Sequence, residues 1–298
     1  MKLSNKIKNQ WQYHVMLLPG VILTFIFCYI PLYGLIMAFQ NYNPGTGFSS
    51  PWVGLDNFKF LFNQPTFVRT IWNTLFISAL KLILGIIVPL FFAVLLNEMI
   101  SQRLKRFFQT LIYIPNFLSW VIVAGVLMDL LSKDGAINQI FGMIGLPAIN
   151  FLGSDKLFPW TMIISDVWKG FGFGTVVYLA ALAGIDPGLY ESAILDGATR
   201  LQKIKSITIP LLKPTIVLML VLSLGNVLNA GFDQIYNLYS PSVYQTGDII
   251  DTYVYRLGFQ QAQYSIGAAV GLFKSVISCV LVLASYVMAD KFAKYKVF

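Results

Sequence analysis

Residues 72–97 read WNTLFISALKLILGIIVPLFFAVLLN and contain a single charged side chain, that of Lys81. A helix needs about 20 mostly apolar residues to cross the hydrocarbon core of a bilayer, and this stretch exceeds that length. Gly85 and Pro89 interrupt it, which a helix in a bundle tolerates because neighbouring helices satisfy the freed backbone groups. The stretch therefore predicts a transmembrane helix.

Five further segments of the chain share this length and polarity. Only 11% of the 298 residues are charged and 57% are hydrophobic, whereas about a quarter of the residues in a soluble domain are charged. We therefore predict an all-α, polytopic membrane protein, with a short N-terminal segment at 1–14 and a single transmembrane domain at 15–298. The six expected spans are 15–39, 72–97, 108–131, 159–184, 211–233 and 266–289.

The placement of Lys and Arg predicts the orientation in the membrane, because cytoplasmic loops are enriched in these residues. With both termini in the cytoplasm, the inner segments hold 13 of the 21 basic residues and the outer segments hold 5. This bias also accounts for the pI of about 9.3 without a nucleic-acid partner. The inner residues are Lys2, Lys6, Lys8, Arg103, Lys105, Arg106, Arg200, Lys203, Lys205, Lys213, Lys291, Lys294 and Lys296; the outer ones are Lys59, Arg69, Lys133, Lys156 and Arg256.

The cytoplasmic loop at 185–210, between the fourth and fifth spans, has a strong helix-start signal. Asp186 followed by Pro187 is typical of an N-cap and a first helical position. Glu191 is expected in the first turn, where it would complement the helix dipole. Gly197 is expected to end this helix, and residues 198–209 to form a second short helix before the fifth span.

One face of the first loop helix carries small residues. Tyr190, Ala193, Ile194 and Gly197 recur at helical spacing, so Ala193 and Gly197 form a notch where another surface can approach the backbone. An amphipathic linker on the membrane surface would also fit this pattern. The spacing alone leaves both interpretations open.

The run Glu191-Ser-Ala-x-x-Asp-Gly-Ala198, followed by Ile207-Thr-Ile-Pro210, resembles the signature loop of permeases in binding-protein-dependent ATP-binding-cassette importers. Ser192 and Ile209 depart from the family pattern but keep its size or character. The longer run from Asp186 to Ala198 is similar to the carbohydrate branch of that family. Further stretches that resemble oligosaccharide permeases are Leu18-Pro-Gly20, Tyr29-Ile-Pro31, residues 39–44, residues 52–58, Tyr113-Ile-Pro115 and Gly231-Phe-Asp-Gln234.

The resemblance implies a type I importer permease of the bacterial cytoplasmic membrane, embedded in lipid, that supplies half of a pore for a sugar or oligosaccharide. It implies three protein partners: a second homologous permease, a cytosolic ATPase dimer and an extracytoplasmic solute-binding protein. The chain itself would hold no cofactor, because the ATPase would bind ATP and Mg. The residues expected to couple to the ATPase are Tyr190, Glu191, Ala193, Asp196, Gly197, Ala198 and Arg200.

Nothing in the sequence suggests chemistry catalysed by this chain. It contains no phosphate-binding loop of the G-x-x-x-x-G-K-[ST] type. Cys28 and Cys279 lie in separate apolar runs without metal-ligand spacing, and His14 stands alone. The sequence therefore predicts a transport subunit and no metal site.

Polar residues within the spans are candidates for the substrate path, because such groups are costly in a membrane. Asp166 and Lys169 lie three residues apart on the fourth span, so the spacing allows them to pair. Asn226, Asn229 and Asp233 are expected to share one face of the fifth span, with Tyr236 one turn beyond. With Asn116 on the third span, these side chains would either bind a sugar or hold neighbouring helices together.

Three alternatives follow from the same residues. An ion-coupled secondary transporter would use Asp166 and Lys169 as a relay. An importer of the same family could carry a solute other than a sugar. A membrane enzyme acting on lipid-linked sugars would need a catalytic cluster at an interface, and the sequence offers none.

Overall fold

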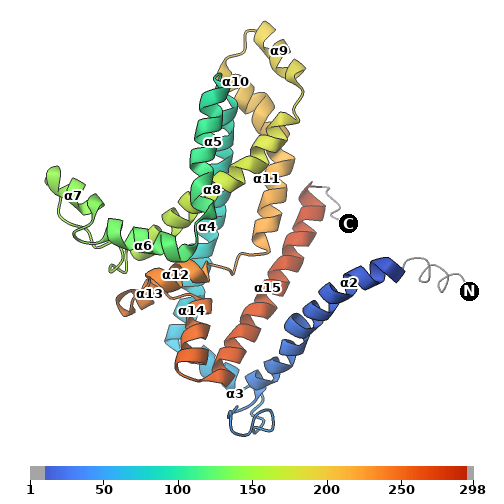
Figure 1. The fold of residues 1–298 in the computed structure, drawn as a ribbon, viewed down its shortest axis with the longest axis vertical. Helices are drawn as coiled ribbons and strands as arrows, with labels where there is room; N and C mark the ends of the chain where they lie inside the picture. The colour runs from blue at the N-terminus through green and yellow to red at the C-terminus, as the bar shows by residue number, and fades with distance from the viewer. Residues whose placement is uncertain (1–10, 294–298) are drawn as a thin grey trace, which may run out of the picture. The chain divides into compact units, whose positions relative to one another are not determined.

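The computed structural model describes residues 11–293, which form helices joined by short loops (Figure 1). Two isolated bridges, Gln40–Trp52 and Asn43–Gly47, are the only β-pairings in this described range. The all-α prediction is confirmed. Most of the expected N-terminal segment 1–14 lies outside the described residues, as do Lys2, Lys6, Lys8, Lys294 and Lys296.

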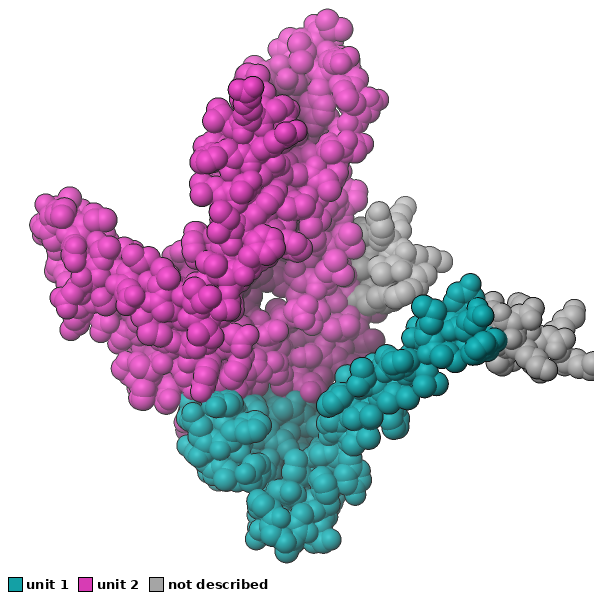
Figure 2. All heavy atoms as spheres, viewed as in Figure 1, with its two compact units in different colours: residues 1–63, 254–273 teal, residues 64–253, 274–298 magenta. Residues whose placement is uncertain are grey.

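The chain divides into two compact units, coloured separately in Figure 2. Unit 1 comprises residues 1–63 and 254–273. Its helical run Trp11–Phe39 contains no Asp, Glu, Lys or Arg, and the large apolar side chains from Val15 to Tyr33 are exposed, as expected for a span facing lipid. The elements of unit 1 are α2 (Trp11–Thr24), η1 (Phe25–Tyr29), η2 (Ile30–Phe39), α3 (Asp56–Phe62), η5 (Arg256–Gln260) and the start of α15 (Tyr264–Ala293).

Unit 2 comprises residues 64–253 and 274–298. Its long helices are α4 (Pro65–Asn97), α5 (Gln102–Phe117), α8 (Phe158–Ala183) and α11 (Ile209–Leu224). Shorter elements are α6 (Trp120–Leu131), α7 (Ala136–Met143), α9 (Pro187–Leu195), α10 (Arg200–Lys203), η3 (Ile204–Thr208), α12 (Phe232–Leu238), η4 (Pro241–Val243), α13 (Tyr244–Gly247) and α14 (Ile250–Tyr255), the last of which ends in unit 1.

Four described helices are long and apolar enough to cross a membrane, and two bent pairs raise the number to as many as six. The expected third span is one of these pairs, because α5 and the run Trp120–Met143, which contains α6 and α7, meet at 102°. Ser119 caps the new helix by accepting a hydrogen bond from the Ile122 amide at 3.3 Å. The second span begins earlier than expected, at Pro65, where proline is favoured as a first helical residue.

The fifth span differs most from its expected course. Arg200–Leu224 forms one continuous helical run, so the expected separate helix at 198–209 joins the span directly. The span was expected to continue to residue 233, but α11 ends at Leu224. Residues 225–231 are not helical, and Gly231 has a φ of +92° that an L-residue with a side chain rarely adopts.

Close helix packing in unit 2 depends on two glycines of α8. A Cβ on Gly174 would lie 2.9 Å from the Pro89 ring of α4, and a Cβ on Gly172 would overlap the backbone carbonyl of Ile112 on α5. The main apolar core lies where α4, α6, α8 and α12 meet. It includes Ile77, Ala124, Phe158, Met162, Ile163, Ala230, Ile235 and Leu238.

Candidate functional site

Lys81 is the centre of a polar cluster inside unit 2. Its side chain is only 8% exposed, and its ammonium group contacts the Asp166 carboxylate at 3.4 Å. It also donates hydrogen bonds to the Ala230 carbonyl oxygen at 2.7 Å and to Oε1 of Gln234. Two hydrogen bonds and the Asp166 counter-charge therefore offset the cost of burying the ammonium group.

Gln234 connects this cluster to α8. Its side chain is fully buried, and its amide group donates to the Met162 carbonyl at 2.7 Å and to Ser165 Oγ at 2.8 Å. Helix termini leave carbonyls without intrahelical partners, and the Ala230 carbonyl lies in the unwound stretch. Lys81 therefore stabilises the break in the fifth span.

A cavity of about 330 Å³ lies beside the break. Apolar side chains of α4 and α11 form part of its wall, and the polar groups come from three helices and the unwound stretch. This mixture of hydroxyl, amide, carboxylate and ammonium groups can hydrogen-bond a polyhydroxylated ligand within an apolar bundle. The polar lining residues are Ser78, Lys81, Asp166, Ser223, Asn226 and Asn229.

Three of the seven expected path residues line this cavity: Asp166, Asn226 and Asn229. The expected pairing of Asp166 with Lys169 is wrong. Asp166 pairs with Lys81, and Lys169 donates to the carbonyl of Asn116 at 3.1 Å and lies 5.4 Å from the centre of the Trp120 ring. Lys169 turns away because the end of α5 offers a carbonyl that no helical amide satisfies.

The remaining two path residues lie on α12. Asp233 is exposed in the first turn of that helix, and Tyr236 stacks on Phe232 at 5.2 Å. The expectation that Asn226, Asn229 and Asp233 share one helical face is wrong, because the chain is unwound between them. The break therefore separates the two asparagines from the aspartate.

Lys81 and Gln234 are functional candidates that the sequence reasoning did not select. In the sequence, Lys81 is the single charged residue of the second span. A lysine in the middle of an apolar span requires a buried acceptor, so this position alone could have indicated a polar cluster. Gln234 was visible only within the Gly231-Phe-Asp-Gln234 resemblance.

The loop at 185–210 forms a second candidate site. α9 begins as expected: Asp186 accepts a hydrogen bond from the Gly188 amide at 2.9 Å, and Pro187 is the first helical residue. Glu191 lies in the second turn, one turn later than expected, since α9 starts at Pro187. α9 bends by 71° from α8 and projects at one end of unit 2 (Figure 1).

Gly197 ends α9 as expected. Its φ is +77°, and the Ala198 amide returns a hydrogen bond to the Ala193 carbonyl at 2.9 Å, which is a common way to close a helix. Thr199 and Gln202 then form a capping box that starts the next helix. The Tyr190 hydroxyl lies 3.0 Å from Thr208 Oγ1, so α9 is braced against the base of the fifth span.

The expected coupling residues surround a shallow recess of about 290 Å³ between the two arms of the loop. Ala193, Asp196, Gly197 and Ala198 line it, whereas Glu191 and Arg200 are exposed beside it. Two large apolar side chains also point outward, with Leu195 88% exposed and Leu201 74% exposed. Exposed apolar groups beside a recess are typical of a protein interface.

The family described as the binding-protein-dependent transport system inner membrane component matches residues 81–294. The chain belongs to this family. The matched range contains both Lys81 and the whole of the 185–210 loop, so both candidate sites lie within the family's shared region.

Relatives of this permease cover nearly the whole chain. The polygalacturonan/rhamnogalacturonan transport system permease protein YteP of Bacillus subtilis is 41% identical over 98% of this chain and 92% of its own. The arabinooligosaccharides permease AraP of the same organism is 30% identical over 92% of this chain and 87% of its own.

Solved structures agree with this assignment. A bacterial ABC transporter that imports the acidic polysaccharide alginate has a chain with a TM-score of 0.91, 43% identity and coverage of 98% of this chain and 99% of its own. A second structure of a bacterial alginate ABC transporter includes a periplasmic protein bound to an alginate pentasaccharide. Its chain has a TM-score of 0.91 and 42% identity, over 99% of both chains.

This permease is therefore a multi-pass inner-membrane transport subunit and not an enzyme. The ion-coupled and enzymatic alternatives do not apply to a member of this family. The proposed ion relay also lacks its basis, because Asp166 and Lys169 do not pair.

Proposed function

We propose that this permease forms half of the pathway by which an oligosaccharide enters the cell, and that a cytosolic ATPase drives it through the 185–210 loop. The observation that carries the proposal is the break at 225–231. It opens a cavity with polar lining inside an apolar bundle, and Lys81 stabilises it. Broken helices that line a cavity are how membrane proteins build binding sites at depth.

The oligosaccharide assignment draws on both the cavity and the relatives. Amide and hydroxyl groups in the cavity suit a ligand rich in hydroxyls. The relatives are named for polygalacturonan and rhamnogalacturonan, for arabinooligosaccharides and for alginate. A substrate of several sugar units is common to all of these names.

The partners follow from the surface of the loop and from the relatives. The recess and the exposed Leu195 and Leu201 offer a docking surface for an ATPase dimer, which would bind ATP and Mg. A second permease would complete the pore, and an extracytoplasmic binding protein would deliver the sugar, as a periplasmic protein accompanies the alginate transporter. The bias of Lys and Arg favours both termini, and this loop, on the cytoplasmic side.

Uptake by proteoliposomes that contain the complete importer and its binding protein tests the proposal. We expect uptake when ATP is enclosed in the vesicle lumen, on the side where the ATPase binds. At least one of three labelled probes should be taken up: a galacturonate, an alginate or an arabinose trisaccharide. Uptake that continues without ATP and stops with an uncoupler would contradict the proposal.

Gly197→Leu is expected to lower ATP-driven uptake by about tenfold or more, equivalent to about 1.4 kcal/mol of docking free energy. A Cβ on Gly197 meets no atom of this chain, so a leucine there projects from the loop toward the partner. The amount of ATPase that copurifies with the permease should decrease together with uptake.

Gly145→Leu is the matched control for this substitution. Gly145 has a φ of +76°, against +77° for Gly197, and a Cβ there also meets open space. Both variants therefore carry the same backbone strain, but Gly145 follows α7, away from the loop. Equal losses of uptake in the two variants would show that strain, not docking, is responsible.

A further inference from the structure

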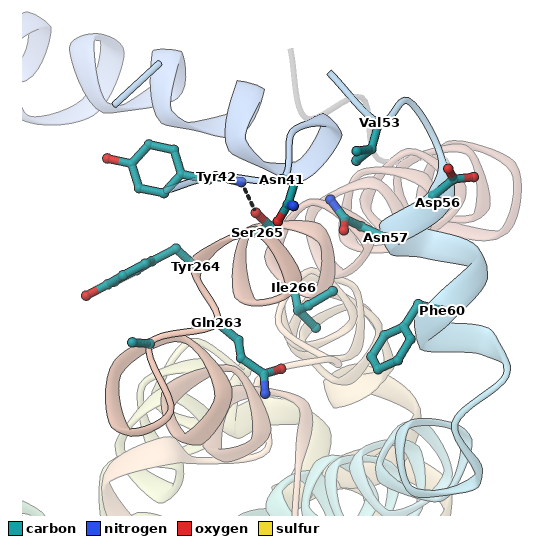
Figure 3. Close-up of a pocket in the computed structure, with 11 residues that line it drawn as sticks. Asn41, Tyr42, Val53, Asp56, Asn57, Phe60, Gln263, Tyr264, Ser265 and Ile266 are labelled. Carbon is teal, nitrogen blue, oxygen red and sulfur yellow. Dashed lines mark hydrogen bonds between the residues drawn. The ribbon is translucent and has the colours of Figure 1, made fainter. Parts of the chain in front are cut away.

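Unit 1 contains a cavity of about 540 Å³ that the proposed pathway does not use (Figure 3). Three segments of unit 1 line it: the chain after η2, helix α3, and the turn that leads into α15. The positive-inside pattern places all three on the outer side of the membrane. The volume is within the range of small-molecule binding sites.

The walls of this cavity are held by hydrogen bonds within unit 1. The Tyr42 amide donates to Ser265 Oγ at 2.8 Å, which joins the first segment to α15. The Asn57 side chain donates to the carbonyls of Ala38 and Gln40 at 2.9 and 3.0 Å, which joins α3 to the end of η2. The cavity is therefore formed before any ligand binds.

Ala262 holds an uncommon backbone conformation at the rim. Its φ of +52° is the only positive value among the described residues other than glycine. The backbone N–H of Gln261 donates to the Arg256 carbonyl at 3.0 Å, and that of Gln263 donates to the Leu257 carbonyl at 2.9 Å. This pattern closes η5 and directs the following residues into the wall of the cavity.

The lining groups suit a sugar. Figure 3 shows the side-chain amides of Asn41 and Gln263 around the hollow, with Phe60 and Ile266 as an apolar surface. Tyr42 and Tyr264 lie at its edge with ring centres 6.0 Å apart. Planar amides with aromatic rings match a ligand that has hydroxyl groups at its edges and C–H groups on its faces.

A protein ligand fits these walls less well. Asp56 is the one charged side chain in the lining, and Lys59 already pairs with it at 3.0 Å. The Asn41 side chain makes no hydrogen bond within the described residues, so its amide is available to a ligand.

We propose that the unit 1 cavity is a second saccharide-binding site, which holds sugar units of the imported oligosaccharide on the outer side of the membrane. The proposal rests on the proposed function for the identity of the ligand. Asn41 and Gln263 would bind the hydroxyl groups, and Phe60 would contact a ring face.

The test uses the assembled importer in nanodiscs without its binding protein. The double variant Asn226→Ala/Asn229→Ala removes amides from the cavity of unit 2 and serves as the background. Saturation-transfer NMR with the galacturonate, alginate and arabinose trisaccharides then reports binding elsewhere. We expect at least one probe to bind in this background.

Adding Asn41→Ala and Phe60→Ala to that background should weaken this binding by about tenfold or more, as expected for the loss of a hydrogen bond and a ring contact. Asn63→Ala is the matched control, since Asn63 ends the same α3 helix and does not line the cavity. Unchanged affinity in the Asn41/Phe60 variant, or no binding of any probe in the background, would overturn the proposal.

Two further outcomes separate this proposal from its alternatives. If the Asn41/Phe60 variant instead loses affinity for the sugar-free binding protein, the cavity is a protein-docking surface and the proposal fails. If a probe binds to the unit 1 cavity but the complete importer shows no ATP-driven uptake, the proposed function is refuted and the site in unit 1 still stands.

Discussion

Replacing Lys81 with methionine is expected to lower the free energy of unfolding by about 2–4 kcal/mol and to abolish most ATP-driven uptake. Methionine keeps the apolar stem but removes two donated hydrogen bonds and one ion pair. The buried Gln234 Oε1 and the Ala230 carbonyl would then lose their donor, and Asp166 its counter-charge. Since Asp166 is 34% exposed, water compensates part of its loss.

Unfolding by SDS titration in mixed micelles measures the stability effect, and proteoliposome uptake measures function. Lys133→Met is the matched control: Lys133 is exposed in the loop after α6, so its loss should change stability by less than about 0.5 kcal/mol. Wild-type stability together with wild-type uptake in Lys81→Met would rule out a stabilising role for this cluster.

The double variant Lys81→Met/Asp166→Asn tests the pairing itself. Neutralising Asp166 removes the unpaired charge that the first substitution leaves, so the combined loss should be smaller than the sum of the two single losses. Strict additivity would indicate that the contact at 3.4 Å contributes no coupling energy.

Gly172→Ala is expected to destabilise the bundle by about 3 kcal/mol, at the upper end of overpacking costs. The added Cβ would overlap the Ile112 carbonyl oxygen, lie 2.6 Å from its carbonyl carbon and lie 3.1 Å from the Tyr113 amide nitrogen. These are backbone atoms, which cannot rotate away as a side chain would. α5 must therefore separate from α8, and the yield of folded permease should fall.

Gly170→Ala is the control for this effect, on the same helix and with the same added methyl group. A Cβ at Gly170 meets no atom within 4 Å, so the substitution should stabilise the helix by about 0.5–1 kcal/mol. Thermal unfolding in detergent should therefore shift in opposite directions for the two variants. Unfolding temperatures that shift by the same amount and in the same direction in both variants would mean that α5 and α8 do not approach closely at Gly172.

Local features were predictable because short-range physical chemistry determines them. Asp186 and Pro187 start α9, and Gly197 ends it, since an N-cap, a fixed proline φ and a left-handed glycine act on neighbouring residues only. The position of Glu191 within α9 was misjudged by one turn.

Features that depend on residues distant in sequence were not predictable in this way. Lys81 lies 149 residues from Ala230 and 153 from Gln234, so spacing could not reveal their contact. The expected pairing of Asp166 with Lys169 followed helical spacing, but each side chain found a different partner on another helix. Sugar contact and helix packing are the two roles predicted for the substrate-path residues. Both stay predictions, which the variants described above test.

Long apolar runs have no stable environment other than lipid, so the order of residues was enough to predict a helical protein embedded in a membrane. The ends of α9 in the 185–210 loop were also predictable, since capping groups act within a few residues. The place where the fifth span breaks and the polar groups around Lys81 depend instead on packing between segments distant in sequence. A buried ammonium group must find acceptors, and the packing of α4 against α8 and the unwound stretch determined which carbonyl, amide and carboxylate lay within its reach.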